Sequence, residues 1–200
     1  MRRVTGFVLL SIATALAADK ERPRFAPGPA ASFASHQTLD KITIAAVPYL
    51  SDAETATAFG KLNPNKYGVL PVLVILENET GKALRLDLTA EFETADNKHV
   101  RALSVDEVQH LRGVTKPPKI TGGKPLPIPF PTRAKSGPLN VWEIEGRAFA
   151  AKLLPVGERA YGFFYFEAEH EQGSKLYLTG IRDASTGQDY FYYEVPLLPQ

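Results

Sequence analysis

The sequence predicts a mainly β protein, an antiparallel sandwich with two short helices in its connections, on three observations. Residues 69–76 and 159–167 are apolar at successive positions, which indicates neighbouring inner strands covered on both faces. Leu84, Leu86 and Leu88 alternate with polar residues, as in a strand with one face in the core and the other in water. Polar turns separate about eight such segments at irregular spacing, which favours an antiparallel sandwich.

Residues 1–17 have the three parts of a secretory signal peptide. Two arginines follow Met1, residues 4–16 form an apolar run, and residues 15–17 (Ala-Leu-Ala) give the small-x-small pattern of a cleavage site. The apolar run is too short for a comfortable membrane span. We expect cleavage before Ala18, no membrane span after the signal is removed, and a periplasmic or secreted mature protein.

The composition excludes several classes of protein. The chain has no cysteine, so it cannot form disulfides, use thiol catalysis or bind zinc or iron–sulfur clusters through cysteine. Its 23 basic and 22 acidic residues are interspersed, and the net charge is +1. Nucleic-acid binding needs a basic stripe that displaces phosphate counterions, and the sequence has none. We expect no nucleic-acid partner and no cofactor.

The segment before the first strand differs in composition from the rest. Residues 18–37 are rich in Pro, Ala and Ser and lack periodicity, so we expect a flexible linker that precedes a single sandwich domain at 38–200. Phe25 and Phe33 are the residues of this linker that could dock on the domain. Residues 39–47 combine β-branched side chains with partial alternation and are expected to form the first strand.

Two capping boxes mark the two helices. In residues 51–54 (SDAE) and 104–107 (SVDE), a serine precedes a glutamate by three positions, which lets the two residues cap each other's backbone. We expect the first helix to run through Phe59 and the second to end at Gly113.

The runs 69–76 and 84–93 flank the polar segment 77–82 (ENETGK), and we expect them to pair as the β-hairpin around which the sheets are organised. Gly81 is expected to take a positive φ in this turn. The triplet at 78–80 (Asn-Glu-Thr) matches the glycosylation sequon. A turn requires Asn and Gly for backbone reasons, so the structural interpretation is preferred.

The segment 114–138 alternates proline with Leu126, Ile128 and Phe130. Proline cannot donate to a sheet ladder, so we expect an extended, polyproline-like loop or edge. Two interpretations stay open: an arm whose apolar side chains contact a partner, or a loop that covers a sheet edge.

The remainder of the chain is expected to end in a hairpin. The apolar residues of 139–154 match neither the spacing of a helix nor that of a strand cleanly. This leaves a strand at 140–144 and a strand or short helix at 147–154 as possible elements. Residues 175–181 and 188–195 are expected to pair across a polar turn.

The sequence contains no recognisable catalytic motif. The four histidines are far apart, and neither a nucleophile elbow nor a zinc-binding helix motif is present. Glu167, Glu169 and Asp183 are the carboxylates on which a hydrolase hypothesis would depend. We expect a non-enzyme without a metal site.

Aromatic residues crowd the last third of the chain, where residues 190–193 read Tyr-Phe-Tyr-Tyr. Because successive strand positions face opposite sides, we expect most of these rings in the core and some at the surface. Exposed tyrosines stack on sugar rings or form docking patches for proteins. The candidate partner-binding residues are Leu126, Ile128, Phe130, Tyr190 and Tyr192.

Residues 59–82 (FGKLNPNKYGVLPVLVILENETGK) and 153–167 (LLPVGERAYGFFYFE) share a wider pattern: an apolar strand, an Asn-containing polar turn, and a Pro-x-Gly turn that leads into an aromatic strand. In this pattern the chain resembles small exported bacterial proteins of unknown function with an immunoglobulin-like β-sandwich. The resemblance implies that fold and no particular activity. The paired cysteines of antibody domains are absent, and Trp142 is not placed to replace their strand tryptophan.

We therefore expect an exported, non-enzymatic β-sandwich protein that acts as a protein-interaction or structural module of the bacterial cell envelope and contacts another envelope protein. The alternative is a carbohydrate-binding module that uses exposed tyrosines to hold a glycan. The alternative requires a flat row of exposed aromatic rings flanked by carboxylate and amide groups.

Overall fold

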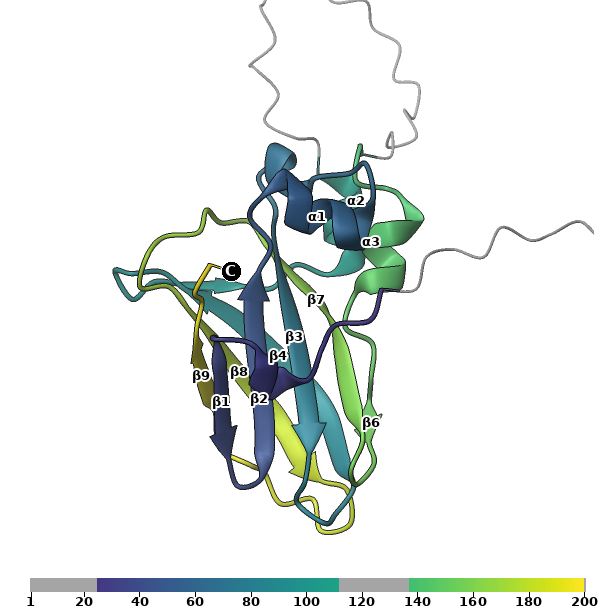
Figure 1. Cartoon of the computed structure of the whole chain (residues 1–200), viewed down its shortest axis with the longest axis vertical. Helices are drawn as coiled ribbons and strands as arrows, with labels where there is room; N and C mark the ends of the chain where they lie inside the picture. The colour runs from purple at the N-terminus through teal and green to yellow at the C-terminus, as the bar shows by residue number, and fades with distance from the viewer. Residues whose placement is uncertain (1–24, 112–136, 200) are drawn as a thin grey trace, which may run out of the picture.

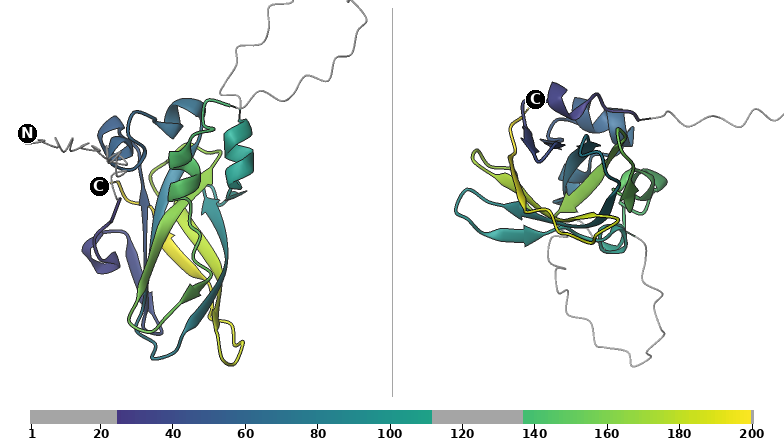
Figure 2. Two further views of the ribbon diagram at one scale, coloured as in Figure 1. Left: turned by 90° about the vertical axis from the view of Figure 1, so that its right-hand side faces the viewer. Right: turned by 90° about the horizontal axis from the view of Figure 1, so that it is seen from below.

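The computed structural model describes residues 25–111 and 137–199, which form nine strands in two antiparallel sheets with a few short helices (Figure 1). Seen along the long axis, the strands form two layers (Figure 2). The mainly β class and the two-sheet arrangement are thus confirmed, while the immunoglobulin-like topology stays a prediction. The signal peptide and the contact candidates Leu126, Ile128 and Phe130 lie outside the described residues.

Sheet A has the strand order β1-β2-β3-β7, and all neighbouring pairs are antiparallel. Val74 of β3 lies opposite Ala46 on one side and Gly162 on the other. The two apolar runs are therefore adjacent strands, as predicted, but β7 is the last strand of the sheet and not an inner one. The strand bounds are β1 (His36–Leu39), β2 (Ile42–Pro48), β3 (Leu70–Asn78) and β7 (Arg159–Phe166).

Sheet B has the strand order β5-β4-β8-β9, and the short β6 also pairs with β4. These pairs are antiparallel too. The strand bounds are β4 (Leu84–Glu93), β5 (His99–Arg101), β6 (Leu153–Leu154), β8 (Lys175–Asp183) and β9 (Tyr193–Pro196).

The predicted hairpin between the runs 69–76 and 84–93 is wrong, because β3 belongs to sheet A and β4 to sheet B. The segment 79–83 is an arch that carries the chain from one layer to the other. Two apolar runs around a polar turn look alike in sequence whether the strands pair edge to edge or stack face to face.

The buried side chain of Asn78 holds this arch. Its Nδ2 donates to the backbone oxygens of Lys82, Leu154 and Pro155 at 2.8, 3.0 and 3.0 Å. Its Oδ1 accepts hydrogen bonds from the backbone N–H and the hydroxyl of Thr80. The amide therefore holds the end of β3 against the segment that leads into β7. These hydrogen bonds give Asn78 a structural role, which accounts for an asparagine at this position of the sequon.

A bulge in sheet B requires a glycine. The register between β4 and β8 shifts between Leu86 and Thr89, and Gly180 opposite this shift has a φ of 89°. A Cβ atom at Gly180 would lie 2.1 Å from the carbonyl oxygen of Asp87. Only glycine fits this close approach of the two backbones.

Apolar side chains form two cores, one on each face of sheet A. Between the sheets, Val72, Val74 and Leu76 of β3 pack with side chains of β4, β8 and β9. On the outer face, Leu73 and Ile75 pack beneath helical residues. The strand is thus covered on both faces, as its continuous apolar run predicts. The covering elements gather at one end of the molecule (Figure 1): α1 (Asp52–Phe59), α2 (Val105–His110), α3 (Trp142–Arg147) and the 3₁₀ turn η2 (Pro64–Tyr67).

Both predicted capping boxes are confirmed. Ser51 Oγ accepts from the backbone N–H of Glu54 at 3.1 Å, and Glu54 Oε2 accepts from the backbone N–H of Ser51 at 2.8 Å. The serine and glutamate before and within α2 form the same pair of bonds. Local sequence alone sets where these helices begin.

The strand expected at 140–144 is wrong, because α3 occupies this part of the chain. Ile144 is fully buried in the outer core, and its carbonyl oxygen accepts a hydrogen bond from the Tyr165 hydroxyl at 2.8 Å. This hydrogen bond joins α3 to β7, a strand that is distant in sequence.

Residues 25–37 differ from the expected flexible linker. The ring of Phe25 lies 5.5 Å from that of Phe163, and the first residue of η1 (Ala30–Ser32) donates its N–H to Glu77 Oε1 at 3.0 Å. The apolar outer face of sheet A supplies a docking surface that the linker composition does not reveal. This segment therefore belongs to the folded body.

The strand expected at 39–47 corresponds mainly to β2, and β1 precedes it in the segment expected to be a linker. β1 and β2 pair across a tight turn in which Asp40 and Lys41 have φ values of 51° and 62°. Left-handed conformations are uncommon for residues other than glycine, and Asp is among the residues that tolerate them. At the other end of the chain, β8 and β9 pair as expected, but β9 is shorter than the predicted 188–195.

Candidate functional site

The outer face of sheet B contrasts with that of sheet A. Along β4 and β8, alternate side chains enter the core, and those between them are mostly exposed or half-buried on the outer face. Such a face, with charged and aromatic side chains on the pleat, is the surface of the described residues best suited to contact a ligand.

Three rings from three segments of sheet B form a row on this face, which we call the aromatic row: His99 of β5, Tyr177 of β8 and Tyr192 just before β9. The rings of Tyr177 and Tyr192 stack with centroids 5.1 Å apart and planes at 28°. The ring of His99 meets that of Tyr177 edge-on at 5.9 Å. Tyr192 is 51% exposed, so part of its ring is open to solvent.

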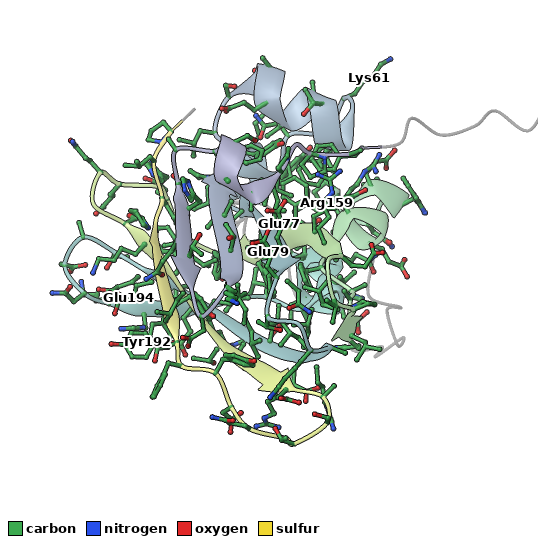
Figure 3. The ribbon with its side chains drawn as sticks, turned by 60° about the horizontal axis from the view of Figure 1, so that its bottom comes forward. Lys61, Glu77, Glu79, Arg159, Tyr192 and Glu194 are labelled. Carbon is green, nitrogen blue, oxygen red and sulfur yellow. The ribbon has the colours of Figure 1, made fainter. Side chains whose placement is uncertain are left out.

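Carboxylates flank the aromatic row. In the strand register, Tyr177 lies between Glu91 of β4 and Glu194 of β9. Glu91 Oε2 lies 2.9 Å from His99 Nδ1, and Glu194 Oε2 lies 3.5 Å from Lys175 Nζ. Figure 3 shows Glu194 and Tyr192 along the β9 edge of the sheet. The row therefore combines ring faces with hydrogen-bonding groups.

The β1–β2 turn and the arch lie at the end of the sandwich opposite the helices (Figure 1), and residues of both line a hollow of about 470 Å³. Three segments distant in sequence meet there: the β1–β2 turn, the arch between the sheets and the segment 188–191. We call this site the end hollow. Its lining residues are Asp40, Lys41, Thr80, Lys82, Gln188, Asp189, Tyr190 and Phe191.

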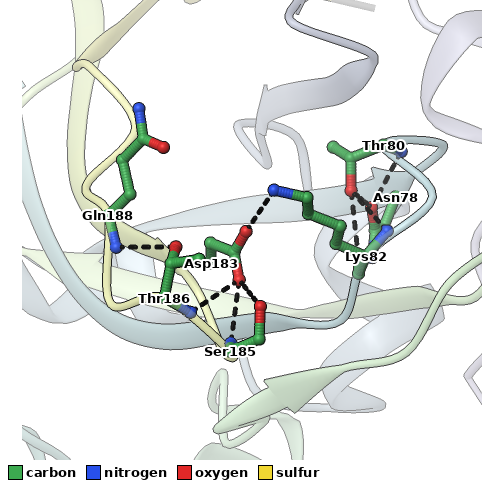
Figure 4. Close-up of polar contacts among 7 residues, drawn as sticks. All are labelled: Asn78, Thr80, Lys82, Asp183, Ser185, Thr186 and Gln188. Atoms are coloured by element: carbon green, nitrogen blue, oxygen red, sulfur yellow. Dashed lines mark hydrogen bonds and ion pairs between the residues drawn. The ribbon is translucent and has the colours of Figure 1, made fainter.

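An ion pair braces one wall of the end hollow (Figure 4). Lys82 Nζ lies 2.7 Å from Oδ2 of Asp183, whose side chain is 2% exposed. The other oxygen, Oδ1, accepts from the Ser185 N–H at 2.8 Å, the Ser185 hydroxyl at 2.6 Å and the Thr186 N–H at 3.1 Å. Asp183 thus fixes both the loop after β8 and the arch.

The same contacts set the protonation of this pair. The hydrogen bond from Lys82, followed by those from Ser185, holds the pKa of the Asp183 carboxyl well below its usual range. The carboxylate in turn raises the pKa of the Lys82 ammonium. Both groups therefore stay charged at neutral pH, and Asp183 is structural.

The structure separates the two tyrosines that the sequence proposed for partner binding. Tyr190 is half-buried, packs against the inner core and lines the end hollow. Tyr192 stands in the aromatic row. The sequence analysis missed Phe191, which is 76% exposed between them, and also missed His99 and Tyr177. The alternation in residues 175–181 could have indicated Tyr177, whereas His99 required knowledge of which strands pair.

The three carboxylates of the hydrolase hypothesis are not brought together. Glu167 and Glu169 are exposed in the loop before β8, and Asp183 is the last residue of that strand. A nine-residue strand spans roughly 26 Å, well beyond the separation of glycosidase carboxylates.

Within residues 25–111 and 137–199, no group of three or more His, Asp or Glu side chains could hold a metal ion, and no helix is long and apolar enough to cross a membrane. Comparison of the chain with protein-family models, with curated proteins and with solved structures gave no match in any of the three. The class of protein is thus defined by its own fold and surfaces: a two-sheet, mainly β protein.

Proposed function

We propose that this protein is an exported, non-enzymatic interaction module of the bacterial cell envelope, and that it contacts its partner through the aromatic row of sheet B. One observation carries this proposal: both faces of sheet A are buried, while the outer face of sheet B presents partly exposed stacked rings. The signal-peptide pattern of residues 1–17 supports export to the periplasm or beyond the cell.

The composition of the aromatic row supports a binding role. Tyrosine is enriched at the centres of protein interfaces because its ring offers a large contact area and its hydroxyl a hydrogen bond. Around Tyr177 and Tyr192, the charges of Lys175 and Glu194 form a polar rim. An apolar centre within a polar rim is the usual arrangement of a contact surface.

The charges at the end of the sandwich also support binding rather than catalysis. Lys82 is paired with Asp183, and Arg182 Nε lies 2.5 Å from Asp189 Oδ1. Charges held in such pairs brace the surface and are poorly suited to act as a general base. These pairs connect the arch and the segment after β8 to the end of β8.

The proposal is tested by co-sedimentation of the mature protein, residues 18–200, with isolated envelopes of the bacterium that produces it. The double variant Tyr177→Ser/Tyr192→Ser should reduce the bound fraction about tenfold, as loss of a central aromatic pair does at other interfaces. Val156→Ser is the matched control, since this apolar side chain is 52% exposed in the turn before β7. Equal binding by the double variant and the wild type would contradict the proposed surface.

The proline-rich segment 114–138 is a second proposed contact. Its residues lie outside those that the structure describes, so this proposal stands on the sequence pattern. Changing Leu126, Ile128 and Phe130 to serine should weaken envelope binding further. Unchanged binding would restrict the contact surface to sheet B.

A further inference from the structure

We propose that the ligand of this surface is a neutral oligosaccharide, with one sugar ring in the end hollow and the following rings along Tyr192 toward Tyr177. This inference rests on the proposed function, because it names the ligand class of the same surface. Four features of the described residues carry it: adjacency, rigidity, hydrogen-bonding chemistry and charge balance.

The end hollow and the aromatic row adjoin along the chain. Phe191 lines the hollow, and Tyr192, the next residue, stacks on Tyr177. Successive Cα atoms are only about 3.8 Å apart, so the backbone that bears Phe191 at the hollow leads directly to Tyr192 in the row. The combined site is elongated, which suits a chain of sugar rings better than a single small molecule.

The segment that joins the two parts is held at both ends. Tyr190 donates its backbone N–H to the Ile181 carbonyl at 2.8 Å, and the Tyr193 hydroxyl donates to the Leu39 carbonyl at 3.3 Å. Between these anchors, Phe191 is 76% exposed. The ring therefore projects into solvent from a fixed backbone, and binding a ligand would order little additional chain.

The hydrogen-bonding groups of the end hollow match sugar hydroxyls. Among the described residues, the side chains of Asp40, Lys41 and Gln188 make no hydrogen bond or ion pair to other groups. Together they offer a carboxylate acceptor, an ammonium donor and an amide that does both. A hydroxyl group is at once donor and acceptor, and the apolar C–H face of a sugar ring packs on an aromatic side chain such as Phe191.

The charges that line the end hollow balance, which favours a neutral ligand. Lys41 and Lys82 oppose Asp40 and Asp189, so no excess positive charge would attract a phosphate or an acidic polymer. The volume of about 470 Å³ lies in the range of small-molecule sites, whereas a protein partner would need roughly 800 Å² of contact on this side.

The test is calorimetric titration of the full mature chain with neutral hexasaccharides of β-1,4-glucose, α-1,4-glucose, xylose, mannose and N-acetylglucosamine, up to roughly 10 mM, well above a millimolar dissociation constant. At least one hexasaccharide should bind. Phe191→Ala and Tyr192→Ala should each weaken binding about tenfold, and Asp40→Asn severalfold, while Val156→Ala should leave it unchanged. Thermal unfolding of each variant shows that the fold is retained.

Absence of binding by the whole panel, or binding that Phe191→Ala and Tyr192→Ala leave unchanged, would overturn the carbohydrate inference. The envelope assay then separates the two proposals. If the Tyr177→Ser/Tyr192→Ser variant still loses envelope binding, the proposed function stands with a protein as partner. If the wild type does not bind envelopes either, the proposed function fails as well.

Discussion

The outer faces of the two sheets differ in residue type and in cover, although side chains point alternately to the two faces in both sheets. On sheet A, the outward side chains are apolar, as with Ile75 and Phe163, and helices and the N-terminal segment cover them. On sheet B, the outward side chains are polar or carry rings with polar tips, as with Glu91 and Tyr177. The difference teaches that sheet A buries apolar side chains on both of its faces, whereas sheet B buries them on one face only.

The physical origin of this difference is the residue type at alternate positions. Burying a large apolar side chain stabilises a fold by about 1.5–3 kcal/mol, so a strand that is apolar on both faces needs cover on both. A strand that alternates needs cover on one face only. β3 is of the first kind and β4 mostly of the second.

The largest expected effect is on the covered face. Phe163 is 1% exposed and contacts the rings of Phe25, Tyr49 and Phe59. Phe163→Ala should lower the free energy of unfolding by about 3–5 kcal/mol, measured by urea denaturation. Tyr177→Ala, on the open face, should lower it by less than about 1.5 kcal/mol. Similar losses for both variants would break the comparison.

The next effect concerns the crossing between the sheets. Asn78→Ala would remove the donor that the Asn78 amide presents to the carbonyl of the buried Leu154 and to that of Pro155. The free energy of unfolding should fall by about 2–4 kcal/mol. Glu79→Ala, next to it and exposed, is the control and should change stability by less than about 0.5 kcal/mol. A small effect of Asn78→Ala would mean that other contacts hold the arch.

A smaller effect is expected from pH at the end hollow. Because Lys82 and Ser185 depress the pKa of Asp183, this carboxylate stabilises the fold fully above its unfolded pKa of about 3.9, and the contribution is lost as pH falls toward the folded pKa. Asp183→Asn should therefore be less stable than the wild type at pH 7. The difference in the free energy of unfolding should shrink below about pH 4. Urea denaturation of both proteins at a series of pH values measures it. A difference that does not vary with pH would contradict this role.

The smallest effect on stability is expected where the effect on binding is largest. Phe191→Ala removes a ring that is 76% exposed, so the free energy of unfolding should change by less than about 0.5 kcal/mol. The same variant should lose most hexasaccharide binding. Thermal unfolding and calorimetry on one preparation would sharpen the distinction between a face used for stability and a face used for contact.

Part of the site was predictable and part was not. Tyr190 and Tyr192 were proposed from the aromatic run, and the structure places one in the end hollow and the other in the aromatic row. His99 and Asp40 could not be predicted. Each comes from a turn or edge far away in sequence, and each reaches the site only because particular strands are neighbours.

By itself, the sequence determined the features that depend on neighbours within a few residues. Both capping boxes, the double-sided burial of β3 and β7 and the turn role of Asn78 follow from local spacing and polarity. Only the tertiary structure decided that β3 and β4 lie in different sheets, that residues 25–37 dock, and that α3 is a helix. The reason is that the spacing of apolar residues predicts which side of a segment must be buried. The surface that buries this side is formed by segments from the whole chain, so local spacing does not predict it.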